Sequence, residues 1–290
     1  MPGLRSHDAS ATSATPALSV HTWAATLRIA GHRVTGFTSP SLAMPLPPPA
    51  AAAVPRRLKE MGPAQVAAII AADPRLIIPV GTCEQHGPHL PLGCATIIAQ
   101  RLADDLSAAT GVIVAPPVEY GVNADAECAF PGNASLRKKT LHRLLNDLLD
   151  SWETTGFREF ILLTAHDHDA HQEALDTVIT RSARVRVVDI YAVDLKDILE
   201  GQAEHLHGGE ADTSLMLYIA PELVRMEWAR DFIPPADSRR YRRGKLRVPK
   251  DSAGSVGRPT LATAAKGKAL YERLRERIGD RIFLVPAPDA

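Results

Sequence analysis

Cysteine is scarce in this sequence of 290 residues, which holds only Cys83, Cys94 and Cys128. A set this small and odd does not fit the disulfide framework of a small secreted domain, so we expect a reducing, cytoplasmic setting. Long apolar runs are missing as well. No stretch approaches the roughly 18 consecutive apolar residues of a membrane span, and the N-terminus lacks the continuous apolar segment of a signal peptide. We therefore expect no membrane association.

Net charge is also missing, because 33 Lys and Arg residues balance 33 Asp and Glu residues. A dedicated nucleic-acid or membrane-surface binder would usually be more basic. The stretch RRYRRGKLR, residues 239–247, is locally basic, and its Tyr241 could stack on a base. In a neutral chain we interpret this stretch as a solvated loop, an arm toward a neighbouring subunit, or a segment that attracts an anionic substrate. Nucleic acid is not expected as a partner.

Residues 1–57 differ in composition from the rest of the chain. They are rich in Ala, Ser, Thr and Pro, and PLPPPAAAAVP at 45–55 is the clearest linker. Such a segment buries too little apolar surface to offset the entropy of ordering it. We therefore predict a disordered tail over 1–57 and one folded domain over 58–290.

From residue 62 onward, short apolar runs alternate with amphipathic stretches. Strands are expected at 76–82, 111–118, 160–164 and 185–193, and helices at 63–72, 96–110, 140–153, 171–182 and 212–220. The helix at 140–153 carries Leu141, Leu145 and Trp152 on one face. Pro79 counts against the first strand, because it removes a ladder donor. The alternation predicts βαβ units and a three-layer α/β/α fold with a mostly parallel sheet.

Ionisable side chains collect just after two of these strands and just before one helix. Glu84 and His86 follow the strand at 76–82, HDHD at 166–169 follows the strand at 160–164, and HGGE at 207–210 precedes the last helix. In parallel α/β folds, sites form at the carboxyl ends of the strands. Carboxylate and imidazole ligands suit Zn, Mn or Fe, so we predict a catalytic metal centre here. Glu84, His86, His166 and Glu210 are the main candidate ligands, His168 and Asp169 are spares, and His207 is the candidate general acid or base.

Four segments together resemble the creatininase (creatinine amidohydrolase) family over roughly residues 62–275. They are VGTCEQHGPHLPLG (80–93), AFPGNASL (129–136), HGGEADTS (207–214) and GSVGRPTLATAAKGKAL (254–270). The third is similar to the family's His-Ala-Gly-Glu…Glu-Thr-Ser pattern. The resemblance implies an α/β protein, often hexameric, with a two-metal centre that hydrolyses non-peptide amides, including cyclic amides and formamides.

The resemblance also implies roles for single residues. Glu84 and His86 would be ligands of different metals, and His166 would be a further ligand. Glu210 would be the later acidic ligand of many members, and His168 stands where the creatinine-hydrolysing members have a ligand Glu. His207 would be the catalytic histidine.

One expected ligand is absent. The family's metal-bridging aspartate lies eleven residues beyond the glutamate, and this sequence has Ala95 at that position. Two dications a few ångströms apart repel strongly unless an anion lies between them. Three outcomes stay open: a hydroxide with a substitute such as Asp167 or Asp169 bridges two ions, one ion suffices, or the site holds none. Cys94 is a further candidate ligand, although such cysteines are more often small buried residues.

We expect a metal-dependent hydrolase that cleaves the C–N bond of a small non-peptide amide through a metal-bound hydroxide. It would use one or two divalent ions (Zn, Mn or Fe) and form a homo-oligomer, a hexamer by family resemblance. An inactive family member that serves as a scaffold or small-molecule binder is an alternative, supported by Ala95. A metallo-β-lactamase-like hydrolase is another, because FILLTAHDHDAH at 160–171 resembles a strand that ends in His-x-His-x-Asp-His. There Asp169 stands one place early, and the βα alternation fits poorly.

Overall fold

A four-stranded parallel sheet lies at the centre of the computed structural model, which describes residues 54–124, 129–202, 205–233 and 252–284. Its strands are β1 (Arg75–Val80), β2 (Ile113–Val114), β3 (Glu159–Thr164) and β4 (Arg184–Asp189), in the spatial order β2-β1-β3-β4. β1 and β3 pair in register from Arg75 opposite Glu159 to Val80 opposite Thr164. The two central strands therefore end level with each other, and the segments that follow them start side by side.

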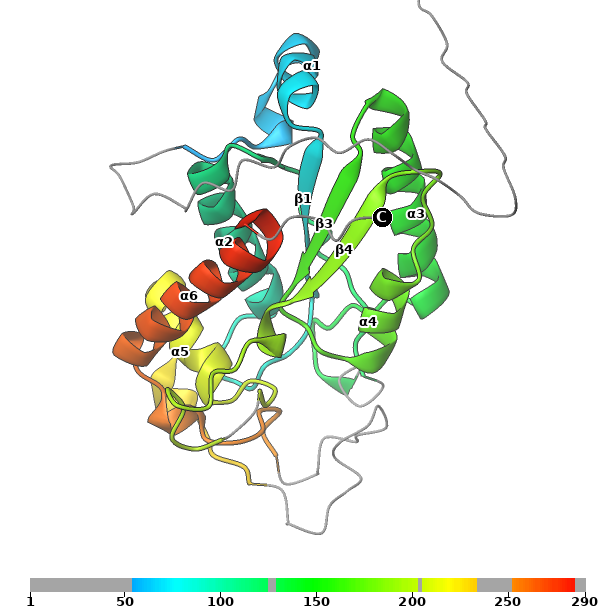
Figure 1. The fold of residues 1–290 in the computed structure, drawn as a ribbon. Helices are drawn as coiled ribbons and strands as arrows, with labels where there is room; N and C mark the ends of the chain where they lie inside the picture. The colour runs from blue at the N-terminus through cyan, green and yellow to red at the C-terminus, as the bar shows by residue number, and fades with distance from the viewer. Residues whose placement is uncertain (1–53, 125–128, 203–204, 234–251, 285–290) are drawn as a thin grey trace, which may run out of the picture. The chain divides into compact units, whose positions relative to one another are not determined.

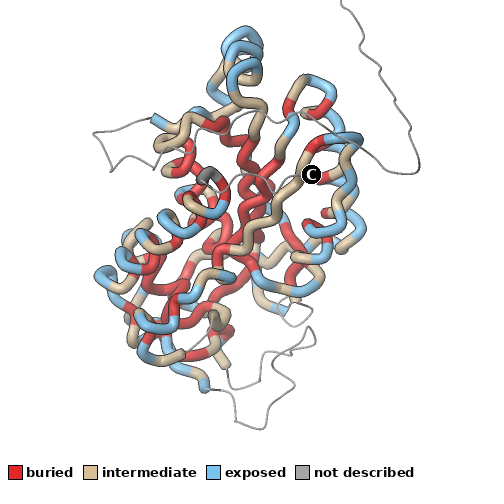
Figure 2. Tube along the Cα trace, viewed as in Figure 1, coloured by how far each residue is buried: buried red, intermediate tan, exposed pale blue. Residues whose placement is uncertain are grey.

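Helices cover both faces of the sheet among the described residues (Figure 1). Because successive side chains of a strand point to opposite faces, Ile77 and Ile161 join one core cluster, and Ile78 and Leu162 join the other. The first cluster includes residues of α2 (Cys94–Thr110), α5 (Glu210–Ile219) and α6 (Ala264–Gly279). The second includes residues of α3 (Lys138–Thr155) and α4 (Asp169–Asp176), with α1 (Pro63–Ala72) at its margin. Buried residues follow the sheet between the layers (Figure 2), and the predicted α/β/α fold is confirmed.

Pro79 lies inside the central strand β1 without breaking the sheet. Its carbonyl accepts from the Val118 N–H at 2.9 Å on the β2 side, so the missing Pro79 N–H also faces that side. Opposite Pro79, β2 has ended. Pro116 and Pro117 follow β2, and neither has an N–H to donate to β1. The ladder therefore loses little at Pro79, and the predicted strand at 111–118 shrinks to Ile113–Val114.

Two other predicted elements also differ from the structure. The helix predicted at 171–182 is α4, which begins at Asp169 and ends at Asp176, before the β-branched run Thr177-Val178-Ile179-Thr180. The strand predicted at 185–193 ends at Asp189, whose carboxylate accepts from the Tyr191 N–H and starts a short 3-10 helix, η3 (Ile190–Ala192). Among the described residues, the 3-10 helices η4 (Pro221–Leu223), η5 (Met226–Trp228) and η7 (Pro259–Leu261) connect later elements. The π-helical stretch η8 (Asp280–Leu284) follows α6.

The predicted N-terminal tail lies outside the described residues except for 54–57. In that short piece, the Arg56 N–H donates to Ser107 Oγ, and Arg57 pairs with Asp104 of α2 at 3.0 Å. The 3-10 helix η1 (Leu58–Glu60) follows. The basic stretch at 239–247 and Cys128 also lie outside the described residues. None of the helices in the described part of the chain is long and apolar enough to cross a membrane.

Candidate metal centre

Glu84, His86 and His207 come together beyond the carboxyl end of the sheet. One potential ligand atom from each lies within 4.8 Å of the others. Glu84 and His86 are 2% and 3% exposed, and the loop that precedes α5 packs on their segment through His207 and Gly208. Ligands that are each about 2 Å from one ion lie about 3.3 Å apart at a tetrahedral angle, so these three side chains could hold a metal ion after drawing slightly closer together.

Glu84 and His166 form a buried ion pair, with Glu84 Oε2 at 3.1 Å from His166 Nδ1. Burial disfavours the charge on both groups, but their mutual attraction outweighs it. It raises the pKa of His166 to about 9 and holds the pKa of Glu84 well below its ordinary value. Burial and the neighbouring His207 lower the pKa of His86 to about 4. His86 is therefore neutral at neutral pH, which is the form of imidazole that binds a metal.

Backbone carbonyls orient three of the imidazoles. His86 Nδ1 donates to the Glu84 carbonyl at 3.0 Å, and His166 Nε2 donates to the Val122 carbonyl at 2.9 Å. His207 Nε2 donates to the Gln85 carbonyl at 2.6 Å. Such bonds fix the ring orientation and the tautomer of metal-binding histidines. The three rings are thus held in place by the main chain.

Gly208 brings His207 close to the segment after β1. Its φ is +60°, and a Cβ at this position would lie 2.5 Å from the His86 carbonyl oxygen. Only glycine allows both the backbone conformation and the close approach. The imidazoles of His86 and His207 consequently stack at a tilt, with ring centroids 4.3 Å apart.

A second network surrounds Asp212 in the first turn of α5. Its Oδ1 lies 3.0 Å from His205 Nε2 and accepts a short hydrogen bond from the Tyr191 hydroxyl, while its Oδ2 accepts from the Gly208 N–H at 2.8 Å. His205 Nδ1 in turn lies 2.9 Å from Asp167 Oδ2. Burial opposes ionisation of Asp212, but His205 keeps its pKa well below the ordinary value. The two carboxylates raise the pKa of His205 well above its ordinary value despite burial.

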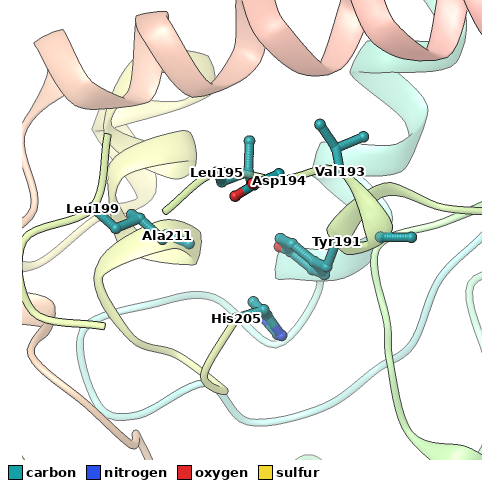
Figure 3. Close-up of a pocket in the computed structure, with 8 residues that line it drawn as sticks. Tyr191, Val193, Asp194, Leu195, Leu199, His205 and Ala211 are labelled. Carbon is teal, nitrogen blue, oxygen red and sulfur yellow. The ribbon is translucent and has the colours of Figure 1, made fainter. Parts of the chain in front are cut away.

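A pocket of about 240 Å³ borders this network (Figure 3). Leu195, Leu199 and Ala211 contribute aliphatic side chains to its lining, and His205 and Tyr191 contribute aromatic rings. The rings of His205 and Tyr191 are stacked, with centroids 3.6 Å apart and planes at 11°. The stack is therefore shared by the pocket and the Asp212 network.

The structure does not bring every predicted ligand into the cluster. Glu210, fully buried, binds Lys266 Nζ at 2.6 Å and the Glu200 and Gly201 N–H groups. Asp169 is exposed at the start of α4. His168 lies beside His166, with ring centroids 5.9 Å apart, and its Nδ1 donates to the Val122 carbonyl.

Ala95 and Cys94 are buried in the core cluster of α2, and burial raises the pKa of the Cys94 thiol well above its ordinary value. Neither therefore supplies the missing acid to the cluster in the described structure.

Asp212 and His205 are the residues that the sequence analysis missed. A signal for Asp212 was present, because the pattern Glu-Thr-Ser places an acid directly before Thr213 and Ser214. Helix geometry also separates Asp212 from Glu210, since residues two apart lie about 200° apart around a helix. No comparable pattern marks His205.

A family model for creatininase (creatinine amidohydrolase) matches residues 59–282. The chain belongs to the creatininase family. The parallel sheet gives no support to the metallo-β-lactamase-like alternative, which requires antiparallel sheets.

Relatives of this creatininase-family chain include hydrolases of different kinds. A 3-dehydro-scyllo-inosose hydrolase from Thermotoga maritima is 29% identical over 73% of this chain and 79% of its own length. A mycofactocin precursor peptide peptidase from Mycolicibacterium smegmatis is 31% identical over 72% of this chain and 84% of its own length. A solved structure of a creatininase with Mn matches with a TM-score of 0.67 and 23% identity, covering 81% of this chain and 100% of that one. Family membership thus indicates a hydrolase, and the structural match shows the fold.

Proposed function

We propose that this creatininase-family protein is a metal-dependent amidohydrolase that cleaves the C–N bond of a small non-peptide amide, cyclic amides and formamides included. The cluster of Glu84, His86 and His207 at the strand ends carries this proposal. A buried carboxylate, a neutral imidazole and backbone-oriented rings fit a divalent ion such as Zn, Mn or Fe. The bound ion would lower the pKa of a water molecule and polarise the substrate carbonyl.

Glu84, His86 and His166 would hold the ion. His166 would release the Nδ1 proton that it now shares with Glu84, because an imidazole binds a metal only in its neutral form. All three are at most 5% exposed, and Glu84 contacts His166 directly while lying in one cluster with His86. Ligands of a catalytic metal are held rigidly by their own hydrogen bonds, and both histidines donate to backbone carbonyls. His168, next to His166, is a reserve ligand.

His207 would carry a proton to the leaving nitrogen. It is only partly buried, unlike Glu84 and His86 in the same cluster. A proton carrier must exchange its proton with substrate or solvent, whereas a ligand must stay fixed. Its ring stacks beside His86, so it lies within reach of an amide bound at the centre.

Removing the His207 imidazole distinguishes a proton carrier from a metal ligand. In Mn- or Zn-loaded protein, His207→Ala is expected to lower kcat about 10²–10⁴-fold and to leave the metal content unchanged. His142→Ala, which replaces a histidine on α3, is the matched control and should change neither quantity. Loss of metal in His207→Ala would make His207 a ligand. Unchanged turnover would contradict its role as proton carrier.

A peptide substrate is the second candidate, because one relative is a mycofactocin precursor peptide peptidase. Comparing kcat/KM for a library of small amides with kcat/KM for short peptides separates the two candidates. Metal-loaded protein that hydrolyses neither would favour the inactive scaffold or small-molecule binder. A cytoplasmic location and a homo-oligomer, a hexamer by family resemblance, remain predictions.

A further inference from the structure

A two-metal centre needs an anion between its ions, and the acids around this centre are already engaged. At the position of the bridging aspartate stands Ala95, whose side chain is buried in the core. Glu210 binds Lys266. Asp189 at the end of β4 accepts from the Tyr191 N–H. Asp167 and Asp212 also lie near the histidines, and both bind His205. Without a bridging anion, two dications repel strongly.

Asp212 has little capacity left for a metal. Its two oxygens accept hydrogen bonds from His205, Tyr191 and the Gly208 N–H, and its side chain is 2% exposed. A carboxylate has about four acceptor positions, so these contacts use most of them. An ion could bind Asp212 only after some of these hydrogen bonds had broken.

The imidazole of His205 is fixed between the two acids. Its Nδ1 and Nε2 lie 2.9 Å from Asp167 and 3.0 Å from Asp212, and Tyr191 stacks on its face at 3.6 Å. Its side chain is 8% exposed. Asp167 and Asp212 therefore share one partner, the imidazole of His205.

We infer that the centre binds one metal ion per chain, because position 95 supplies no bridging acid and His205 occupies Asp212 and one oxygen of Asp167. The inference rests on the proposed function, since it concerns the number of ions at the same centre.

Metal stoichiometry of the full chain tests the inference. Protein reconstituted with excess Mn²⁺ and freed of loosely bound ions should contain about one Mn per chain by elemental analysis. His205→Ala releases Asp167 and Asp212 and is expected to raise the content toward two. His142→Ala should stay at one. The electron paramagnetic resonance spectrum of loaded wild-type protein should show isolated Mn²⁺, with no spin-coupled pair, and this measurement requires no variant to fold.

The outcomes distinguish the two proposals. Two ions per chain or a spin-coupled spectrum in the wild type would overturn the inference and leave the proposed hydrolase intact. One ion in both the wild type and folded His205→Ala would overturn the role of His205. No bound Mn²⁺ or Zn²⁺ in the wild type would overturn the proposed function and the inference with it.

Discussion

Glu210 and Asp212 stand two residues apart in the first turn of α5, yet their carboxylates have different partners. Glu210 binds Lys266 of α6 at 2.6 Å, whereas Asp212 binds His205 at 3.0 Å. The helix directs Glu210 toward α6 and Asp212 toward the histidines. Glu210, which its motif predicts as a metal ligand, is thus bound to Lys266. Asp212, two residues further on, faces the histidines instead.

Metal content separates the roles of the two glutamates. Glu84→Gln removes the buried anion of the cluster and is expected to reduce bound metal at least tenfold. Glu210→Gln should leave the metal content at the wild-type value, because Glu210 binds Lys266 instead of the cluster. Elemental analysis of both variants after the same reconstitution checks this. A matching loss of metal in Glu210→Gln would show that the Lys266 pair opens to form the site.

Lys266→Ala should destabilise the fold. It leaves the fully buried carboxylate of Glu210 with backbone N–H partners only. Breaking a buried pair from one side costs about 3 kcal/mol in the free energy of unfolding, measured by urea denaturation. The double variant Lys266→Met with Glu210→Gln should recover much of this loss, since no buried charge remains. If the double variant is as unstable as the single one, charge burial is not the cause.

Gly267 permits the closest approach of α5 and α6. A Cβ on Gly267 would lie 1.8 Å from the Ser214 carbonyl oxygen, so the two helices would have to separate. We expect Gly267→Ala to lower the free energy of unfolding by about 3 kcal/mol. Gly62→Ala is the control for steric room, because the nearest atom to its Cβ is a flexible Gln65 oxygen at 3.8 Å. It should cost less than Gly267→Ala, since it only replaces the N-cap residue of α1. Equal stabilities of Gly267→Ala and the wild type would show that the helices shift at little cost.

Glu153 should make stability depend on acid pH. This buried α3 carboxylate accepts from the N–H groups of Arg181, Ser182 and Ala183 and from the Ser182 hydroxyl. Burial opposes ionisation, but these donors lower its pKa below the ordinary value. A depressed folded-state pKa stabilises the fold above the unfolded-state value of about 4.3, and this contribution is lost as the pH falls through the folded-state pKa.

Glu153→Gln is therefore expected to lower the free energy of unfolding by about 1–3 kcal/mol at pH 7. The difference from wild type should narrow between about pH 5 and about pH 3, as followed by urea denaturation. Glu222→Gln, at an exposed position, should show neither effect. A constant difference across this pH range would contradict the role of the ionised carboxylate.

The sequence predicted the features that depend on local pattern. Alternating apolar runs predicted the sheet and its layers, and the positions of Glu84 and His166 after their strands predicted that they meet. The ends of the elements were less predictable, because they depend on single hydrogen bonds. β2 ends where Pro116 and Pro117 lack an N–H, and β4 ends where the Asp189 side chain accepts from the Tyr191 N–H. The partner of Glu210 was not predictable from its motif, since Lys266 lies 56 residues away in the sequence. The role of His205 was unpredictable for the same reason, because its position between Asp167 and Asp212 depends on tertiary contacts.

Anomalous diffraction from crystals of the Mn²⁺-loaded protein tests the central claim most directly, because it locates the ion. The account predicts one strong peak per chain at about 2.0–2.2 Å from the Glu84 carboxylate and the His86 imidazole, with His166 beside it and His207 next to the open side. A peak at Glu210 or at Asp212 alone, or no peak near Glu84, would contradict the proposed metal centre and the hydrolysis assigned to it.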